Sequence, residues 1–213
     1  MLLYHVFLQI YILLRELLFV LQRPRLWRFY LYFQCEYFFF SPYYFADKKA
    51  KTNQIFGFTP LFTMFHIYNG LRKFNSSNSY TQSFCDLGSG DFRTVFLMSL
   101  YFKLPAAGIE MNEKFVRKAM FINKALKSEK TVIESGNFFD YSLAAYGIIF
   151  LAWTTFNKKM RNDIITKMTS ELKKGSIVLT LSQPVEDKHF KLFGSEEFLF
   201  SWGRSEVFYH ETQ

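Results

Sequence analysis

The sequence has few of the residues that mark unusual folds: two cysteines, five prolines and ten glycines in 213 residues. Cys35 and Cys85 alone cannot make a disulfide framework, which suggests a reducing compartment. No repeat period runs through the chain, so collagen-like and solenoid folds are excluded. Charged residues are 21% and hydrophobic residues 50% of the chain, which excludes a disordered protein and a multi-span transporter. The length fits one domain of roughly 100–200 residues with some residues left over.

What the sequence does contain is aromatic and basic. Aromatic residues make up 21%, with 28 Phe and 13 Tyr, and the net charge is +8. Residues 1–80 hold nine Lys or Arg and only three Asp or Glu. Around residues 23–33 the basic side chains alternate with Trp, Tyr and Phe, which favours a lipid interface over a nucleic-acid arm. A solvated basic face beside a packed aromatic helix is the alternative.

Residues 1–22 predict one helix, because no Gly or Pro interrupts them and Pro24 follows. Apolar residues fill one half of the helix. Arg15 and Glu16 interrupt the run, and a charge at mid-bilayer costs about 2.5–3.5 kcal/mol, so an interfacial helix fits better than a spanning one. Packing of the helix on its own domain is the alternative. We expect residues 1–55 to form a hydrophobic and basic N-terminal segment, of which residues 1–45 could dock on a membrane.

From residue 56 onward, strands and helices alternate. Strands are predicted at 84–87, 107–110, 131–135, 146–152 and 177–182, and helices at 60–73, 92–104, 113–126 and 158–173. Two alternating segments, 197–202 and 206–211, predict an antiparallel pair joined by Gly203. The fold class is therefore α/β, a Rossmann-like parallel sheet with helices on both faces and a C-terminal hairpin, preceded by the aromatic-rich helical segment.

The candidate chemistry lies at the ends of the first three strands. Residues 86–91 read Asp-Leu-Gly-Ser-Gly-Asp, a turn whose glycines let a ligand approach the backbone. Glu110 ends the second strand, where a carboxylate can accept both hydroxyls of a ribose. Asn137 and Phe138 follow the third strand, where they can bond an adenine edge and stack on its face. Such a set, in this order, predicts a nucleoside-containing cofactor.

The type of cofactor follows from two positions. A nicotinamide or flavin dinucleotide requires a third small residue in the glycine-rich turn, but Arg93 stands there. Asp86, before the first glycine, instead suits S-adenosylmethionine, which carries an amino acid group. We therefore predict S-adenosylmethionine as the cofactor.

Residues 56–211 resemble the class I S-adenosylmethionine-dependent methyltransferases. Within them the segment looks like the non-SET histone-lysine methyltransferases (the disruptor-of-telomeric-silencing type) and their small bacterial relatives. It is also similar to the lysine methyltransferases of the ATP synthase c subunit. Residues 56–60 look like the family's loop over the cofactor's methionine end, residues 108–112 match its ribose motif, and residues 201–210 match its closing hairpin.

The resemblance implies a methyltransferase domain over residues 56–213 that N-methylates a protein lysine by in-line transfer. The implied cofactor-binding residues are Thr59, Asp86, Gly88, Ser89, Gly90, Glu110, Asn137 and Phe138. The implied catalytic residues, around an apolar acceptor channel with Phe58, are Trp153, Thr154 and Phe156. A small or lipidic acceptor at a membrane is the alternative.

Two features complete the prediction. Phe92 stands where the family has its third glycine, and a ring there would crowd the methionine pocket. A protein that keeps the fold but only binds is therefore a third alternative. The histidines and cysteines have no metal-site spacing, so no metal is expected. We expect a cytoplasmic or membrane-associated protein with a protein substrate and no nucleic-acid partner.

Overall fold

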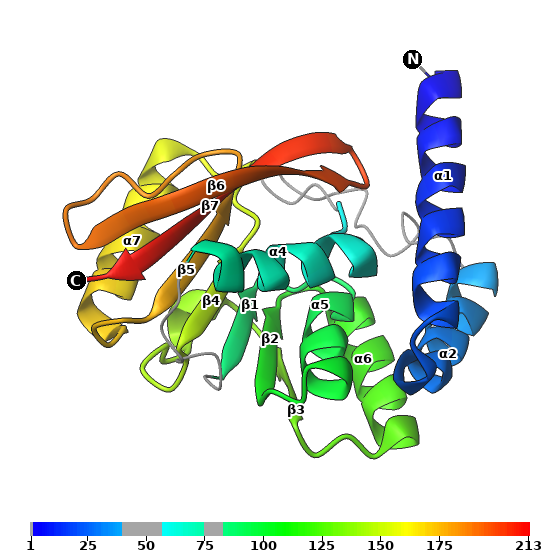
Figure 1. Cartoon of the computed structure of the whole chain (residues 1–213). Helices are drawn as coiled ribbons and strands as arrows, with labels where there is room; N and C mark the ends of the chain where they lie inside the picture. Colours follow the sequence, from blue (N-terminus) through cyan, green and yellow to red (C-terminus); the bar gives the residue numbers. More distant parts are fainter. Residues whose placement is uncertain (1, 40–56, 75–82) are drawn as a thin grey trace.

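The computed structural model describes residues 2–39, 57–74 and 83–213. Its centre is a seven-stranded sheet in the order β3-β2-β1-β4-β5-β7-β6 (Figure 1). The five parallel strands are β1 Phe84–Leu87, β2 Ala106–Glu110, β3 Thr131–Ser135, β4 Ile148–Leu151 and β5 Ile177–Leu181. The hairpin strands β6 (Phe190–Phe200) and β7 (Gly203–Thr212) are antiparallel, with β7 beside β5. This confirms the predicted Rossmann-like sheet with a C-terminal hairpin.

Helices cover both faces of the sheet. Buried side chains of α4 (Leu61–Phe74), α5 (Arg93–Phe96) and α6 (Glu113–Leu126) share one core cluster. Those of α7 (Lys158–Glu171) belong to a second cluster on the other side. Successive strand residues point to opposite faces, so in β1 Phe84 joins the first cluster and Cys85 the second.

Two predicted elements differ from the structure. The helix expected at 92–104 is α5 followed by a π-helical turn, η2 (Leu97–Tyr101), and it lies between Phe92 and Lys103, which have φ angles of 62° and 63°. The hairpin strands are longer than predicted, because a register shift between Leu192 and Gly194 breaks the alternation of side chains that marks a strand.

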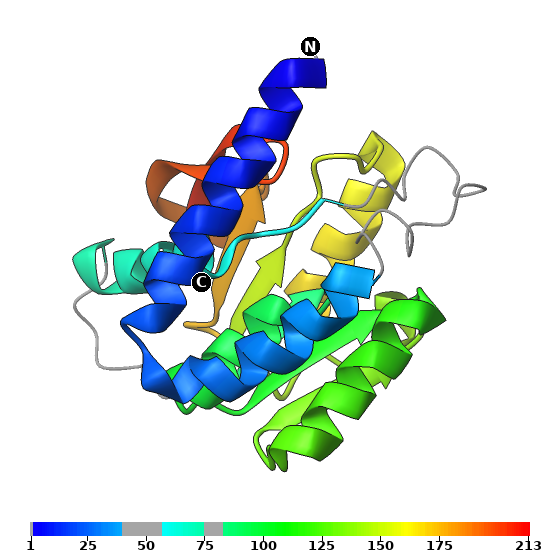
Figure 2. The same cartoon turned by 90° about the vertical axis from the view of Figure 1, so that its right-hand side faces the viewer.

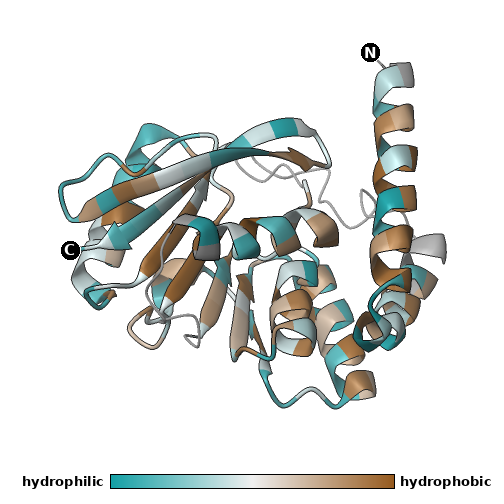
Figure 3. Ribbon diagram, in the orientation of Figure 1, coloured by the Kyte–Doolittle hydropathy of each residue, from teal (hydrophilic) through white to brown (hydrophobic). Residues whose placement is uncertain are grey.

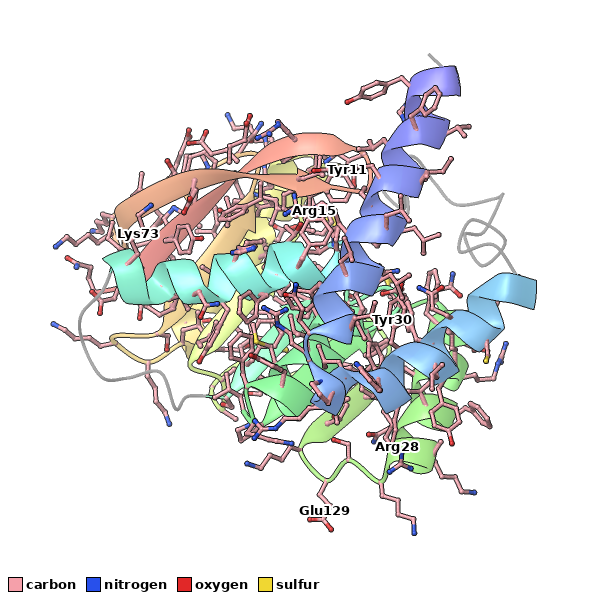
Figure 4. The ribbon with its side chains drawn as sticks, turned by 45° about the vertical axis from the view of Figure 1, so that its right-hand side comes forward. Tyr11, Arg15, Arg28, Tyr30, Lys73 and Glu129 are labelled. Atoms are coloured by element: carbon pink, nitrogen blue, oxygen red, sulfur yellow. The ribbon has the colours of Figure 1, made fainter. Side chains whose placement is uncertain are left out.

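The N-terminal helices lie along one side of the sheet domain (Figures 1 and 2). Helix α1 (Leu2–Leu21) leads through a 3-10 turn, η1 (Pro24–Leu26), into α2 (Trp27–Phe39). Helix α2 lies within the helical segment predicted for residues 1–55, for which no separate second helix is predicted. Tyr30 lies between the two helices, and Arg28 points toward α6, where its guanidinium lies 3.5 Å from the Ala125 carbonyl oxygen (Figure 4).

One strip of α1 packs on the domain. Leu8, Ile12, Phe19 and Val20 are buried in the same core cluster as α4 and α5. Most of its apolar half is exposed, and the N-terminal part of α1 extends beyond the sheet (Figure 3). The packing of α1 on its own domain is therefore confirmed for this strip, and the membrane interface stays a prediction. The predicted boundary at residue 55 lies outside the described residues.

Candidate functional site

An open pocket lies at the carboxyl ends of β1 and β4. Strand order reverses between these two strands, and such a switch point is where open α/β sheets bind their ligands. The lining residues come from the loop before α4, the turn after β1, the start of α5 and the end of β4. They are Gly57, Phe58, Thr59, Asp86, Gly88, Ser89, Gly90, Asp91, Arg93, Thr94, Phe150 and Ala152.

The glycine-rich turn is tied to the end of β2. Gly88 and Gly90 have φ angles of 80° and 54°, which a side chain would disfavour. The backbone N–H groups of Gly88 and Ser89 both donate to the Ile109 carbonyl, at 2.9 and 3.0 Å. The turn is thereby fixed with its backbone lining the pocket.

Glu110 holds the same turn through its side chain. Its Oε2 accepts from the Gly90 N–H and its Oε1 from the Asn112 N–H, both at 2.8 Å. Burial raises the pKa of Glu110, and the backbone donors act in the opposite direction. The carboxylate at this strand end is an acceptor suited to ribose hydroxyls, although it does not itself line the pocket.

Asp86 is a buried carboxyl in the pocket wall, with 4% of its surface exposed. The hydroxyls of Thr94 and Ser89 donate to its Oδ2. Burial raises the pKa of Asp86 to about 7 despite these bonds. A cationic ligand group beside this carboxyl would favour its ionised form.

Asn137 and Phe138 lie at the end of β3, outside the pocket lining. Asn137 caps the short 3-10 helix η3 (Phe138–Asp140), where its Oδ1 accepts from the Phe139 N–H at 3.1 Å. The Phe138 ring is 5% exposed and stacks on Phe156, with centroids 6.0 Å apart. In this conformation both residues have structural contacts of their own.

The ring of Phe92 points away from the pocket. It is fully buried in the first core cluster, and a Cβ placed on Gly108 would lie 2.7 Å from it. Gly108 in β2 therefore provides the space that the Phe92 ring occupies. The expectation that Phe92 crowds the methionine pocket is wrong, because the left-handed backbone turns the ring toward the sheet.

The three implied catalytic residues follow β4, and none of them lines the pocket. Trp153 is 1% exposed in the second core cluster and donates from Nε1 to the Gln183 carbonyl. It packs there because its neighbour Ala152 faces the pocket. Thr154 is exposed, with its hydroxyl 3.3 Å from that of Ser182, and Phe156 packs against the same cluster as Trp153.

The loop before α4 forms the opposite wall. The Phe58 N–H donates to Ser201 Oγ at 2.8 Å, and the Ser201 N–H donates to the Phe58 carbonyl at 3.2 Å. Gly57 lies against the Trp202 ring, which leaves no room for a side chain. Gln9 of α1 donates to the Ser201 carbonyl at 2.7 Å. The hairpin turn and α1 thus hold this loop over the pocket, as the resemblance implies for residues 56–60.

Solved structures share this architecture. An RNA methyltransferase from Salinibacter ruber, in complex with S-adenosyl-L-homocysteine, has a TM-score of 0.54 at 17% identity over 69% of this chain and 90% of its own. The magnesium protoporphyrin IX methyltransferase of Synechocystis PCC 6803, with bound S-adenosylmethionine, has a TM-score of 0.57 at 12% identity, covering 72% of this chain and 79% of its own. The fold is that of the S-adenosylmethionine-dependent methyltransferases.

TrmN from Thermus thermophilus is also similar, with a TM-score of 0.58 at 13% identity over 73% of this chain, which spans 49% of TrmN. No protein-family model and no curated protein sequence matches the chain. The methyltransferase neighbours include RNA and porphyrin enzymes, so this fold does not determine the methyl acceptor.

Sequence reasoning missed one cluster in this methyltransferase fold, formed by Glu16, Asp91 and Arg93. Arg93 lines the pocket, yet its side chain is only 5% exposed and is paired with both carboxylates. The residue that could have pointed to this cluster is Glu16, which is the one acid in residues 1–35 and lies in a mostly apolar helix. In the described residues no group of three or more His, Cys, Asp or Glu is placed to hold a metal ion.

Proposed function

We propose that this chain is an S-adenosylmethionine-dependent methyltransferase that N-methylates a protein lysine at a membrane surface. The observation that carries the methyl-transfer part is the pocket at the β1–β4 switch point, with the glycine-rich turn on one side and Glu110 at the next strand end. The fold neighbours crystallised with S-adenosylmethionine or its product support the same cofactor.

The proposed cofactor-binding residues divide between the two halves of the ligand. Thr59, Asp86 and the backbone of residues 88–90 would take the methionine half, because they line the pocket. Glu110 would take the ribose, and Asn137 with Phe138 the adenine after a local adjustment of η3. Methyl transfer from a sulfonium needs mainly alignment of donor and acceptor, so no nucleophile–base pair is required in the protein.

The pocket chemistry supports an amine acceptor. Phe58, Phe150 and Ala152 contribute apolar wall, which favours the neutral form of an entering lysine amine. Thr154, exposed two residues after Ala152, is the proposed hydroxyl that orients the acceptor. Among the residues lining the described pocket, Arg93 is the one Lys or Arg, and it is paired with carboxylates.

The membrane part rests on the outer face of α1 and α2. Residues 4–21 of α1 are long and apolar enough to cross a membrane by length and composition. Because Ile12, Phe19 and Val20 pack on the domain, we propose that α1 instead lies flat on the lipid. Exposed Arg25 and Arg28 near Trp27 would contact anionic headgroups. The exposed apolar side chains of this face are Tyr4, Val6, Phe7, Ile10, Tyr11, Leu13, Leu14, Leu17, Leu18, Leu21, Trp27 and Leu31.

Vesicle flotation tests the membrane part. A Leu14→Glu/Leu18→Glu variant should lose at least about a hundredfold in affinity for anionic vesicles, since each buried leucine contributes about 1.5–3 kcal/mol. Val132→Glu/Leu192→Glu is the matched control, because these side chains are also 45% and 49% exposed but lie on β3 and β6. Equal vesicle binding by all three proteins would refute lipid docking through α1.

Transfer of labelled methyl groups tests the acceptor. The protein is incubated with tritiated S-adenosylmethionine and, separately, with membrane protein, lipid extract or RNA. We expect label in the protein fraction, recovered as methyl-lysine after acid hydrolysis. Label found only in lipid or only in RNA would show that the acceptor is not a protein lysine. If no fraction is labelled and the protein does not bind the cofactor, the proposed methyltransferase activity is refuted.

A further inference from the structure

Glu16 occupies an unusual place on α1. It lies on the strip that packs against the domain, between Ile12 and Phe19, and only 3% of its surface is exposed. A buried carboxylate is costly unless it is paired and hydrogen-bonded. Both conditions are met here by partners on two other elements.

The first partner is the start of α4. Glu16 Oε1 accepts from the Leu61 N–H at 2.8 Å, which satisfies one of the free N–H groups in the first turn of that helix. Leu61 follows the pocket loop of residues 57–59 after a single proline. Glu16 therefore fixes the point where this loop enters α4.

The second partner is Arg93, at the start of α5. Its Nη1 lies 3.2 Å from Glu16 Oε1, while its Nε donates to Asp91 Oδ1 at 3.0 Å and its Nη2 donates to Asp91 Oδ2 at 2.6 Å. The guanidinium carbon also lies 3.8 Å from the centroid of the Phe58 ring. Arg93 thus joins α1, the pocket loop and the glycine-rich turn.

We infer that Glu16 is a positioning residue of the cofactor pocket, which joins its two walls by bonding Leu61 on one side and Arg93 on the other. Asp91, Arg93 and Phe58 all line the pocket, whereas Glu16 does not, so Glu16 acts through them. The N-terminal helix is then a structural part of the cofactor site as well as a docking surface. The inference rests on the proposed cofactor, but on neither the acceptor nor the membrane.

The charge balance gives the physical reason. With Glu16 ionised, the guanidinium is shared between two carboxylates and is held in the plane that contacts Phe58. Burial raises the pKa of Glu16, and Arg93 beside it opposes that shift. Loss of the Glu16 charge removes one of the two carboxylates that pair with Arg93 and one negative charge near the site of a cationic cofactor.

Titration calorimetry with S-adenosylmethionine tests the inference. Glu16→Gln should raise the dissociation constant about tenfold or more, the effect of one hydrogen bond to a charged group. Ile12→Ala is the matched control, because Ile12 is 1% exposed one turn earlier on α1 and has an apolar side chain. It should lower the melting temperature at least as much as Glu16→Gln, but change the dissociation constant less than about threefold.

A double-mutant cycle separates positioning from packing. If Glu16 acts through Arg93, Glu16→Gln should add little to the loss caused by Arg93→Gln. Glu16→Asp keeps the buried charge but is one methylene too short to reach both partners. If Glu16→Gln does not fold, the dissociation constant of Glu16→Asp is the quantity to measure. Glu16→Asp should weaken binding several-fold.

Three results would overturn the inference. They are wild-type affinity in Glu16→Gln and Glu16→Asp, an equal loss in Ile12→Ala, and additivity with Arg93→Gln. Absence of cofactor binding by the unmodified protein would overturn the proposed function together with this inference. Retained binding in the unmodified protein and in the Glu16 variants would overturn the inference alone.

Discussion

Asp86 is the residue whose charge state most directly controls the pocket. Its pKa is about 7 in the ligand-free protein, and its carboxyl faces the proposed site of the methionine half of the cofactor. A cationic cofactor favours the carboxylate, so binding and deprotonation are linked. We expect the affinity for S-adenosylmethionine to rise about tenfold from pH 6 to pH 8. Calorimetry at three pH values measures this, and the same slope in Asp86→Asn would contradict it.

Glu110 has two roles that substitutions can separate. Glu110→Ala removes both the proposed ribose acceptor and the bonds to the Gly90 and Asn112 N–H groups. It should weaken S-adenosylmethionine binding at least about tenfold. Glu110→Gln keeps one acceptor for the backbone and should lose less. If both variants bind as the parent does, the ribose assignment is wrong.

At the scale of elements, the start of α5 combines a strained backbone with a buried ring. Phe92→Gly would relieve a left-handed conformation worth about 1–2 kcal/mol but would delete a core ring worth about 3–5 kcal/mol. The net effect should be a loss of about 2 kcal/mol in the free energy of unfolding, measured by urea denaturation. Cofactor affinity of the folded variant should be unchanged, and a gain in affinity would show that the ring does affect the pocket.

Strand β7 contains a buried histidine, His210. Its Nε2 accepts from the Val185 N–H at 3.0 Å, its Nδ1 lies 3.2 Å from the Val178 carbonyl, and burial lowers its pKa to about 4. Because this pKa lies below the unfolded value, the stability it contributes is complete above about pH 6.5 and is lost as the pH falls toward 4. The loss should reach about 3 kcal/mol.

Urea unfolding at pH 7 and pH 4.5 checks this prediction. His210→Gln should show a smaller acid destabilisation than the parent. The comparison must be made between the two proteins, because the raised pKa values of Asp86 and Glu16 give a pH dependence of the opposite sign. Equal acid destabilisation in both proteins would rule out His210 as its source.

At the scale of the whole molecule, the local sequence pattern predicted the features that depend only on neighbouring residues. The strand–helix alternation and the turn at residues 86–91 followed from spacing alone, and the structure has them in that order. The direction of the Phe92 ring did not, because it depends on a φ angle and on space at Gly108. The pairing of Glu16 with Arg93 spans 77 residues, and only the folded chain brings them together.

The burial of α1 shows the same limit. Its amphipathic pattern left open whether the helix contacts lipid or packs on its own domain. The domain contacts the narrow strip that contains Glu16, where this carboxylate pairs with Arg93. The apolar half remains exposed, which is a property of the assembled molecule.

The bond between Gln9 and Ser201 joins residues 192 positions apart, and it belongs to the set that holds the pocket loop. A chain still being synthesised has its glycine-rich turn long before the hairpin leaves the ribosome. It therefore has one wall of the pocket without the other. The loop of residues 57–59 can therefore be held over the glycine-rich turn only after Ser201 has left the ribosome.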